Sequence, residues 1–210
     1  MQLLALAGFL APEKLISSFG TIGLFLIVFA ESGLLIGFFL PGDSLLFTAG
    51  LLAANHQFGL RYPVLAVGFF ASAVLGDQVG YWFGQRIGPA LFTRPKSRLF
   101  NPHHVERAQE FFDRHGARTI VLARFIPIVR TFTPILAGVS KMRYRTFVIY
   151  NLVGGLVWGV GVTTAGYLLG KRYPALGDNL IYVSIIVIAI SLLPIMFEVR
   201  KARRNRKFEA

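Results

Sequence analysis

Long apolar stretches alternate with short polar ones along this chain, and the charges inside the apolar stretches predict what each one forms. Residues 64–83 carry a single charge, Asp77, and residues 147–170 carry none. Each stretch has about the 20 residues that a helix needs to cross the hydrocarbon core of a bilayer. The pattern therefore predicts a transmembrane helix in each of them, and another in residues 180–197.

Two further apolar stretches are interrupted by proline and by charge. Residues 19–54 are too long for one crossing and short for two, and residues 119–139 contain two prolines and two arginines. Because proline removes a backbone donor, neither stretch suits a continuous helix. We predict that each forms a re-entrant hairpin. The interrupting residues are Glu31, Pro41, Gly42 and Asp43 in the first stretch, and Arg124, Pro127, Arg130 and Pro134 in the second.

Basic residues gather in two places and predict the topology. The polar residues 86–118 form one cluster, in which Asn101-Pro102 and Gly116 mark the ends of a short amphipathic helix on the membrane surface. The tail after residue 197 forms the other. Lysine and arginine concentrate on the cytoplasmic side of membrane proteins, so we place both clusters there. The stretch 119–139 then enters and leaves the membrane on that side.

The two halves of the chain repeat each other. Phe39-Leu40-Pro41 and Phe125-Ile126-Pro127 lie 86 residues apart (41 to 127), and so do Gly80-Tyr81 and Gly166-Tyr167 (80 to 166). Each half is thus a proline-broken hairpin followed by a glycine-containing helix, and the topology makes those helices run in opposite directions. An inverted repeat of this kind is typical of secondary transporters. The simpler alternative is that the hairpins only pack around each other.

Composition and charge agree with a membrane protein. Hydrophobic residues make up 54% of the 210 residues and charged residues only 15%, too few to cover a soluble domain. This excludes a soluble globular enzyme, a disordered chain and a nucleic-acid-binding domain. The net charge of +12 instead indicates contact of the basic tail with an anionic membrane surface. The chain has no cysteine and no acid cluster at metal spacing, so we expect neither a metal nor a cofactor.

Five charges inside the apolar stretches are the candidate functional residues: Glu31, Asp43, Asp77, Arg124 and Arg130. Each costs about 2.5–3.5 kcal/mol at a helix centre, so each has to be paired or useful. Two carboxylates at one cavity suit proton uptake and release, which is the role expected of Glu31 and Asp43. Two guanidinium groups suit a phosphate headgroup, which is the role expected of Arg124 and Arg130. A set of purely structural salt bridges is the alternative.

Four residues are expected to support this site: Asp77, Pro41, Gly42 and Pro127. The Pro41-Gly42 break should fold the chain so that Glu31 and Asp43 reach one cavity. The break at Pro127 should let both arginines point into it, because six residues of an unbroken helix would turn them apart.

The sequence resembles the DedA family, also called the SNARE-associated or VTT-domain superfamily, over nearly its whole length. The resemblance rests on Glu31-Ser32, Phe39-Leu40-Pro41-Gly42-Asp43, Gly76-Asp77-Gln78-Val79-Gly80-Tyr81, Arg124-Phe125-Ile126-Pro127, Arg130 and Ala137-Gly138. It implies lipid translocation that depends on the proton motive force, with undecaprenyl phosphate or a phospholipid such as phosphatidylethanolamine as cargo. The family's functional acids map onto Glu31 and Asp43 and its functional arginines onto Arg124 and Arg130. It also implies both termini in the cytoplasm.

We therefore predict an all-α polytopic protein of the bacterial cytoplasmic membrane that transports lipid and is not an enzyme. An H⁺-coupled cation antiporter is the first alternative, and acids outnumbering arginines in the cavity would favour it. A lipid phosphatase is a weaker alternative, since no nucleophile with a histidine or metal is visible, and a membrane-insertion chaperone stays open. The partners expected are a lipid, protons and the anionic membrane surface, without nucleic acid. The sequence leaves open whether the protein forms a homo-oligomer and which lipid headgroup it recognises.

The expected organisation is an N-terminal segment 1–18, a membrane domain 19–179, a C-terminal transmembrane helix 180–197 and a cytoplasmic tail 198–210. Within the membrane domain the repeat halves cover about 19–88 and 117–172. An amphipathic cytoplasmic linker, 89–116, joins them.

Overall fold

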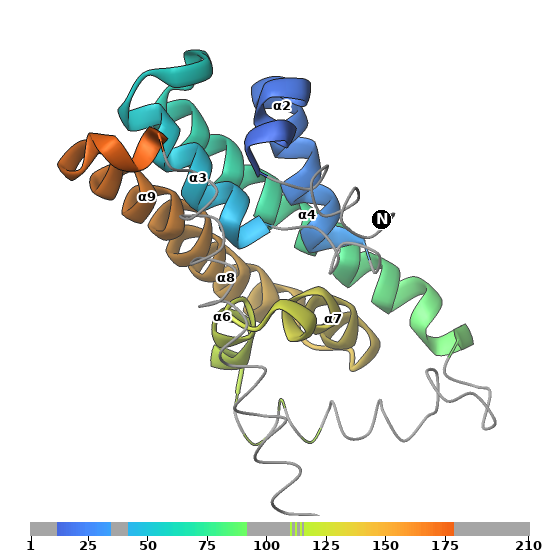
Figure 1. Cartoon of the computed structure of the whole chain (residues 1–210). Helices are drawn as coiled ribbons and strands as arrows, with labels where there is room; N and C mark the ends of the chain where they lie inside the picture. Colours follow the sequence, from blue (N-terminus) through green and yellow to red (C-terminus); the bar gives the residue numbers. More distant parts are fainter. Residues whose placement is uncertain are drawn as a thin grey trace, which may run out of the picture.

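The computed structural model describes residues 12–34, 42–91, 110, 112, 114 and 116–178, and this part of the chain is all helical (Figure 1). Pro41, most of the predicted linker helix, helix 180–197 and the basic tail lie outside the described residues. The helices are α2 (Pro12–Gly33), α3 (Gly42–Ala54), η2 (Gln57–Gly59), α4 (Tyr62–Leu91), α6 (Arg118–Ala123), α7 (Pro127–Val139), α8 (Tyr144–Gly155), η3 (Leu156–Val160), α9 (Gly161–Arg172) and η4 (Pro174–Asp178).

Three described helical stretches are long and apolar enough to cross a membrane: Lys14–Gly33, Tyr62–Ile87 and Tyr144–Arg172. The last two contain the predicted segments 64–83 and 147–170, and the chain has the architecture of a polytopic membrane protein. In Tyr144–Arg172, α8 and α9 are joined through η3, a single π-helical turn. Two shorter apolar helical stretches, Gly42–Ala54 and Val129–Val139, belong to the proline-broken regions.

The first broken region differs from the prediction at its start. Helix α2 begins at Pro12, so the apolar helix is longer than the segment that begins at residue 19. Gly20 divides it, with φ 58° and ψ −170°. Because residues with a Cβ rarely adopt a positive φ, glycine permits the kink at this position. The part of α2 after Gly20 leads to Glu31.

Each broken region folds back on itself. Glu31 near the end of α2 accepts the backbone N–H of Gly42 at the start of α3, and η2, which follows α3, contacts α2 again. Ile120 near the start of α6 belongs to one buried cluster with Ala137 near the end of α7. The beginning and end of each helix pair therefore lie together, so α2–α3 and α6–α7 are both hairpins.

The two short helices are exchanged between the halves of the chain. Helix α3 packs mainly against α9 of the second half, and α7 packs mainly against α4 of the first half. Glycines make these close approaches, as the GxxxG pattern would at a membrane helix crossing. A Cβ at Gly80 would lie 3.2 Å from Pro134 Cβ on α7, and one at Gly166 would overlap the Phe47 carbonyl oxygen on α3. The repeated glycine motif thus makes the corresponding contact in each half.

Helix α4 and the α8–η3–α9 helix run in opposite directions (Figure 1). Near the start of α4, Tyr62 stacks on Tyr167 of α9 with ring centroids 4.5 Å apart. Farther along α4, Tyr81 stacks on Phe147 of α8, also at 4.5 Å. The order of contacts along the two helices is therefore reversed, as the predicted topology requires.

The tips of the two hairpins reach the middle of α4. A Cβ at Gly33, the last residue of α2, would lie 2.7 Å from the Gly76 carbonyl oxygen. Arg124, at the turn between α6 and α7, forms an ion pair with the next residue of α4, Asp77. Polar side chains from both hairpins therefore gather at one level of the bundle.

A substitution at the exchanged helix contact should destabilise the fold. We expect Gly166→Ala to lower the free energy of unfolding by about 1–3 kcal/mol, because its Cβ would overlap the Phe47 carbonyl oxygen of α3. Thermal unfolding of the detergent-solubilised protein measures this. Gly161→Ala on the same helix is the matched control, since a Cβ there meets nothing within 4 Å. Equal midpoints for the two variants would contradict the close packing of α3 on α9.

Candidate functional site

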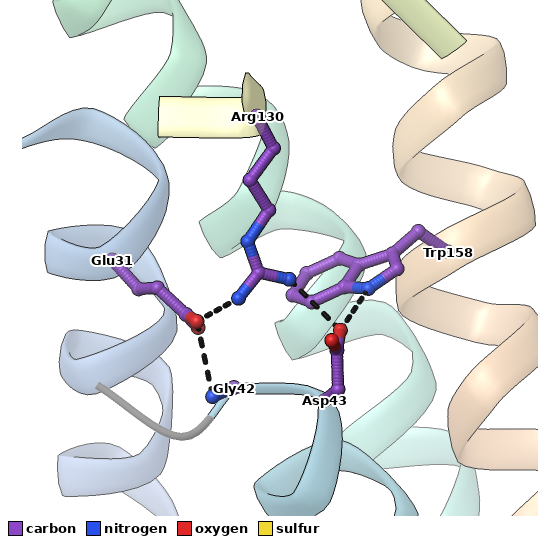
Figure 2. Close-up of polar contacts among 5 residues, drawn as sticks. All are labelled: Glu31, Gly42, Asp43, Arg130 and Trp158. Carbon is purple, nitrogen blue, oxygen red and sulfur yellow. Dashed lines mark hydrogen bonds and ion pairs between the residues drawn. The ribbon is translucent and has the colours of Figure 1, made fainter. Parts of the chain in front are cut away.

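Arg130 lies between two carboxylates at the place where the hairpin tips meet (Figure 2). Glu31 is in the last turn of α2, Asp43 in the first turn of α3 and Arg130 in the first turn of α7. The three residues are close because three helices begin or end here. Helix α7 begins at Pro127, whose fixed φ suits the first turn of a helix.

The guanidinium group of Arg130 uses two nitrogens for the two acids. Nη1 donates to Asp43 Oδ1 at 2.8 Å, and Nη2 donates to Glu31 Oε1. Glu31 Oε1 also accepts the backbone N–H of Gly42 at 3.0 Å. The side chain of Glu31 is fully buried, that of Arg130 is 6% exposed and that of Asp43 is 19% exposed. Asp43 is therefore the more accessible of the two acids.

Position 42 requires glycine, because the Glu31 carboxylate occupies the space that a side chain would need. A Cβ at this position would overlap that carboxylate. Its supporting role was predicted as a break in the chain, and the structure adds a second role, the N–H that the buried acid accepts. Pro41, the other half of the predicted break, lies outside the described residues.

Trp158 completes the cluster, and the sequence analysis did not select it. Its indole N–H donates to Asp43 Oδ1 at 2.6 Å, and the Arg130 Cζ lies 4.8 Å from the centroid of its ring. Trp158 lies in η3, the π-helical turn, and is 1% exposed. The sequence did offer one indication of this role. An indole N–H in an apolar helix without charges needs a hydrogen-bond acceptor when it is buried.

Two polar atoms of this ion pair lack a hydrogen-bond partner among the described residues, Glu31 Oε2 and Arg130 Nε. Both atoms are buried. Unpartnered buried polar atoms are costly and are usually paired in stable cores. The cluster therefore combines one cation, two acids and unused hydrogen-bonding capacity.

Arg124 lies in a second cluster, apart from the first. Its Nη2 donates both to Asp77 of α4 and to the Asn151 Oδ1 of α8. Asn151 in turn donates from Nδ2 to the Val74 carbonyl oxygen at 3.1 Å. The prediction that both arginines reach the acids Glu31 and Asp43 is therefore corrected.

The turn between α6 and α7 explains the separation of the two arginines. Ile126 has an extended backbone, with φ −117° and ψ 106°, and it divides the segment at Pro127. The break does release Arg124 and Arg130 from one helical register, as predicted. It directs Arg124 to the α4–α8 contact and Arg130 to the end of α2 and the start of α3.

Known proteins share most of this chain. The VTT domain model matches residues 40–168. Protein DedA of Escherichia coli K12 is 42% identical over 181 residues, which cover 86% of this chain and 82% of that protein. The chain belongs to the VTT-domain family. The match includes Asp43, Asp77, Arg124, Arg130 and Trp158, so both polar clusters fall within or directly beside the VTT domain.

Other relatives of this VTT-domain protein are membrane proteins by name. Uncharacterized membrane protein Rv0364 of Mycobacterium tuberculosis H37Rv is 48% identical over 186 residues, 87% of this chain and 81% of that protein. Inner membrane protein YqjA of Escherichia coli K12 is 38% identical over 148 residues, 70% of this chain and 66% of that protein. No solved structure matches significantly.

Proposed function

We propose that this VTT-domain protein moves a lipid with a phosphate headgroup across the bacterial cytoplasmic membrane and couples the movement to protons. The observation that supports the proposal is Arg130, a buried guanidinium group held by two acids at the meeting point of two hairpins. Such a group binds phosphate through a planar fork of N–H donors. Undecaprenyl phosphate and phosphatidylethanolamine both offer the phosphate oxygens.

Protons would make Arg130 available to the cargo. While Glu31 and Asp43 are ionised, they occupy two of its nitrogens. A proton on either acid removes the charge attraction and weakens its hydrogen bond with the guanidinium group. The phosphate then takes the place of that carboxylate, and loss of the proton on the other side of the membrane restores the ion pair and expels the headgroup.

The hairpin that carries Arg130 suits a lipid rather than a water-soluble anion. Three of its apolar side chains remain exposed, Leu122 at 66%, Phe125 at 44% and Phe132 at 37%. They offer acyl or isoprenoid chains an apolar path beside a charged cluster. The headgroup would thus visit Arg130 while the tails stay in the bilayer.

We also propose that the two hairpins are re-entrant and form an inverted repeat in the membrane. The exchange of α3 and α7 between the halves and the opposite directions of α4 and α8–α9 support this arrangement. In it, the α6–α7 hairpin enters from the cytoplasm and the α2–α3 hairpin from outside. The C-terminus and its basic tail lie in the cytoplasm, against anionic lipid.

A labelling experiment tests the topology in this cysteine-free chain. Arg118→Cys and Lys141→Cys flank the α6–α7 hairpin and should both resist an impermeant thiol reagent added to intact cells. Arg61→Cys, just before α4, should react, because α4 crosses the membrane from there. Labelling of only one of the two hairpin positions would show a full crossing and remove the inverted repeat.

An H⁺-coupled cation antiporter is the second candidate, and one observation favours it. With Arg124 paired to Asp77, the acids around Arg130 outnumber the arginines. A metal cation would, however, have to displace a tethered guanidinium group from both acids. A proton needs only to neutralise one acid to make Arg130 available to an anion, so lipid phosphate remains the first candidate.

Transport by purified protein in liposomes tests the function. Fluorescent lipids with a phosphate monoester, a phosphatidylethanolamine or a neutral sugar headgroup are compared with and without a pH gradient. We expect the phosphate lipids alone to move, and to move faster with the gradient. Sodium or potassium flux without lipid movement would favour the antiporter, and release of inorganic phosphate from the monoester would indicate a phosphatase. Absence of both fluxes would leave a role in membrane insertion.

A further inference from the structure

Trp158 contacts both Arg130 and Asp43, and its two contacts have different chemistry. The N–H at the ring edge donates to Asp43 Oδ1, the same oxygen that accepts from Arg130 Nη1. The ring face lies against the Arg130 guanidinium group. One side chain therefore holds the acid by its edge and the base by its face, as Figure 2 shows.

From these contacts we infer that Trp158 is a positioning residue that keeps Asp43 on Arg130 and thereby sets the pH at which Arg130 becomes available to cargo. The inference rests on the proposed function for its transport consequence, but the contact itself does not. A hydrogen bond to an ionised carboxylate favours the ionised form. Removing the indole N–H should allow Asp43 to take a proton at higher pH.

Charged groups from two other helices belong to the cluster of Asp43. Helix α2 contributes Glu31 and α7 contributes Arg130. Helix α4 carries Asp77, which is held by Arg124 in the second cluster. At Asp43 Oδ1, the indole N–H thus adds a neutral donor beside the charged guanidinium group.

The position of Trp158 in a π-helical turn agrees with this role. Single π-helical turns inside α-helices occur frequently at functional sites. Residues before and after η3 belong to α8 and α9, which pack against other helices. The turn therefore aims one indole at the cluster while the rest of the helix keeps its packing.

The pH profile of transport in proteoliposomes is the first test. Trp158→Phe keeps an aromatic face for Arg130 and removes only the N–H donor. We expect the pH profile of the Trp158→Phe variant to shift by about one pH unit toward higher pH, the size typical of one lost hydrogen bond to a charged group. Trp82→Phe is the matched control, because Trp82 is 54% exposed on α4, and its profile should be unchanged. A Trp158→Phe profile that does not shift, whether or not the maximum falls, would overturn the inference.

Fluorescence provides a second test that does not depend on transport. The chain has two tryptophans, so Trp82→Phe leaves Trp158 as the reporter. Excitation moves electron density away from the pyrrole nitrogen, so the Asp43 charge beside it should shift the emission to longer wavelength. Adding Asp43→Asn to Trp82→Phe should move the emission back to shorter wavelength.

The two tests separate failure of the inference from failure of the proposed function. An emission shift in a protein that moves no lipid would retain Trp158 as the partner of Asp43 and remove the lipid-transport function. Identical spectra with and without Asp43→Asn would reject the contact itself. If the Trp158→Phe variant fails to insert, the emission spectra of Trp82→Phe with and without Asp43→Asn still test the contact between Trp158 and Asp43.

Discussion

Arg130→Lys should reduce lipid transport by about tenfold to a hundredfold while the protein stays folded. Lysine keeps a positive charge for Glu31 and Asp43, so no buried acid is left without a counter-ion. It loses the planar fork that donates from Nη1 and Nη2 to different acids and lies over the Trp158 ring. The expected loss corresponds to about 1.5–3 kcal/mol, the range for hydrogen bonds to charged groups. Transport rates in liposomes measure the loss of activity, and thermal unfolding checks that the variant stays folded.

Arg124→Lys provides the matched comparison for Arg130. Arg124 holds both Asp77 and Asn151 with the single nitrogen Nη2, which an ammonium group can imitate. We therefore expect the Arg124→Lys variant to retain most of the transport activity. We therefore propose Arg130 as the headgroup ligand, while Arg124 anchors the α6–α7 turn to α4 and α8.

The arginine comparison has two outcomes that would reverse these assignments. Equal losses in Arg124→Lys and Arg130→Lys would restore the prediction that both arginines bind the headgroup. Full transport by Arg130→Lys, together with full binding of a phosphate lipid, would leave Arg130 as a structural ion pair. Arg130→Ala is less informative, because removing one partner of a buried ion pair typically destabilises a protein by about 3–5 kcal/mol.

Glu31→Gln and Asp43→Asn should each abolish the response of transport to an imposed pH gradient. The amides keep the size of the side chain and remove the titration. Each variant leaves Arg130 with the other acid, so the ion pair persists and the protein should insert normally. Lipid movement in liposomes with and without the gradient measures the response.

Glu110→Gln is the control for the acid variants, because Glu110 is exposed and outside both clusters. Its response to the gradient should equal that of the unmodified protein. If either amide variant responds normally, the proton role of that acid is wrong, and if both do, proton coupling through this cluster is wrong.

The comparison of sequence and structure is clearest for the charged residues. All five intramembrane charges could be selected from the sequence, because a charge in an apolar stretch is costly wherever it lies and has to find a partner. The sequence also indicated where the chain breaks, since Pro127 removes a backbone donor and α7 begins there. The pairing of these charges did not follow from it. Arg130 could have met Asp77 as readily as Glu31 on spacing alone.

The partners of Trp158 and Asn151 could not be predicted from the sequence either. Each is a neutral polar residue in a helix without charges, and nothing in that pattern indicates which acid or base it would meet. Trp158 reaches Asp43 across 115 positions of the chain, and Asn151 reaches Arg124 across 27. Such contacts depend on where helices from different parts of the chain cross.

The sequence by itself determined that this chain is a helical membrane protein with charges inside its apolar stretches and proline breaks in two of them. These properties depend on hydropathy and on local backbone chemistry, which each residue carries wherever the chain goes. Only the tertiary structure decided that α3 and α7 exchange between the halves, that Arg124 and Arg130 serve different clusters and that Trp158 holds Asp43. Those outcomes depend on close glycine contacts between helices and on the direction of single side chains, which are fixed only when the helices pack.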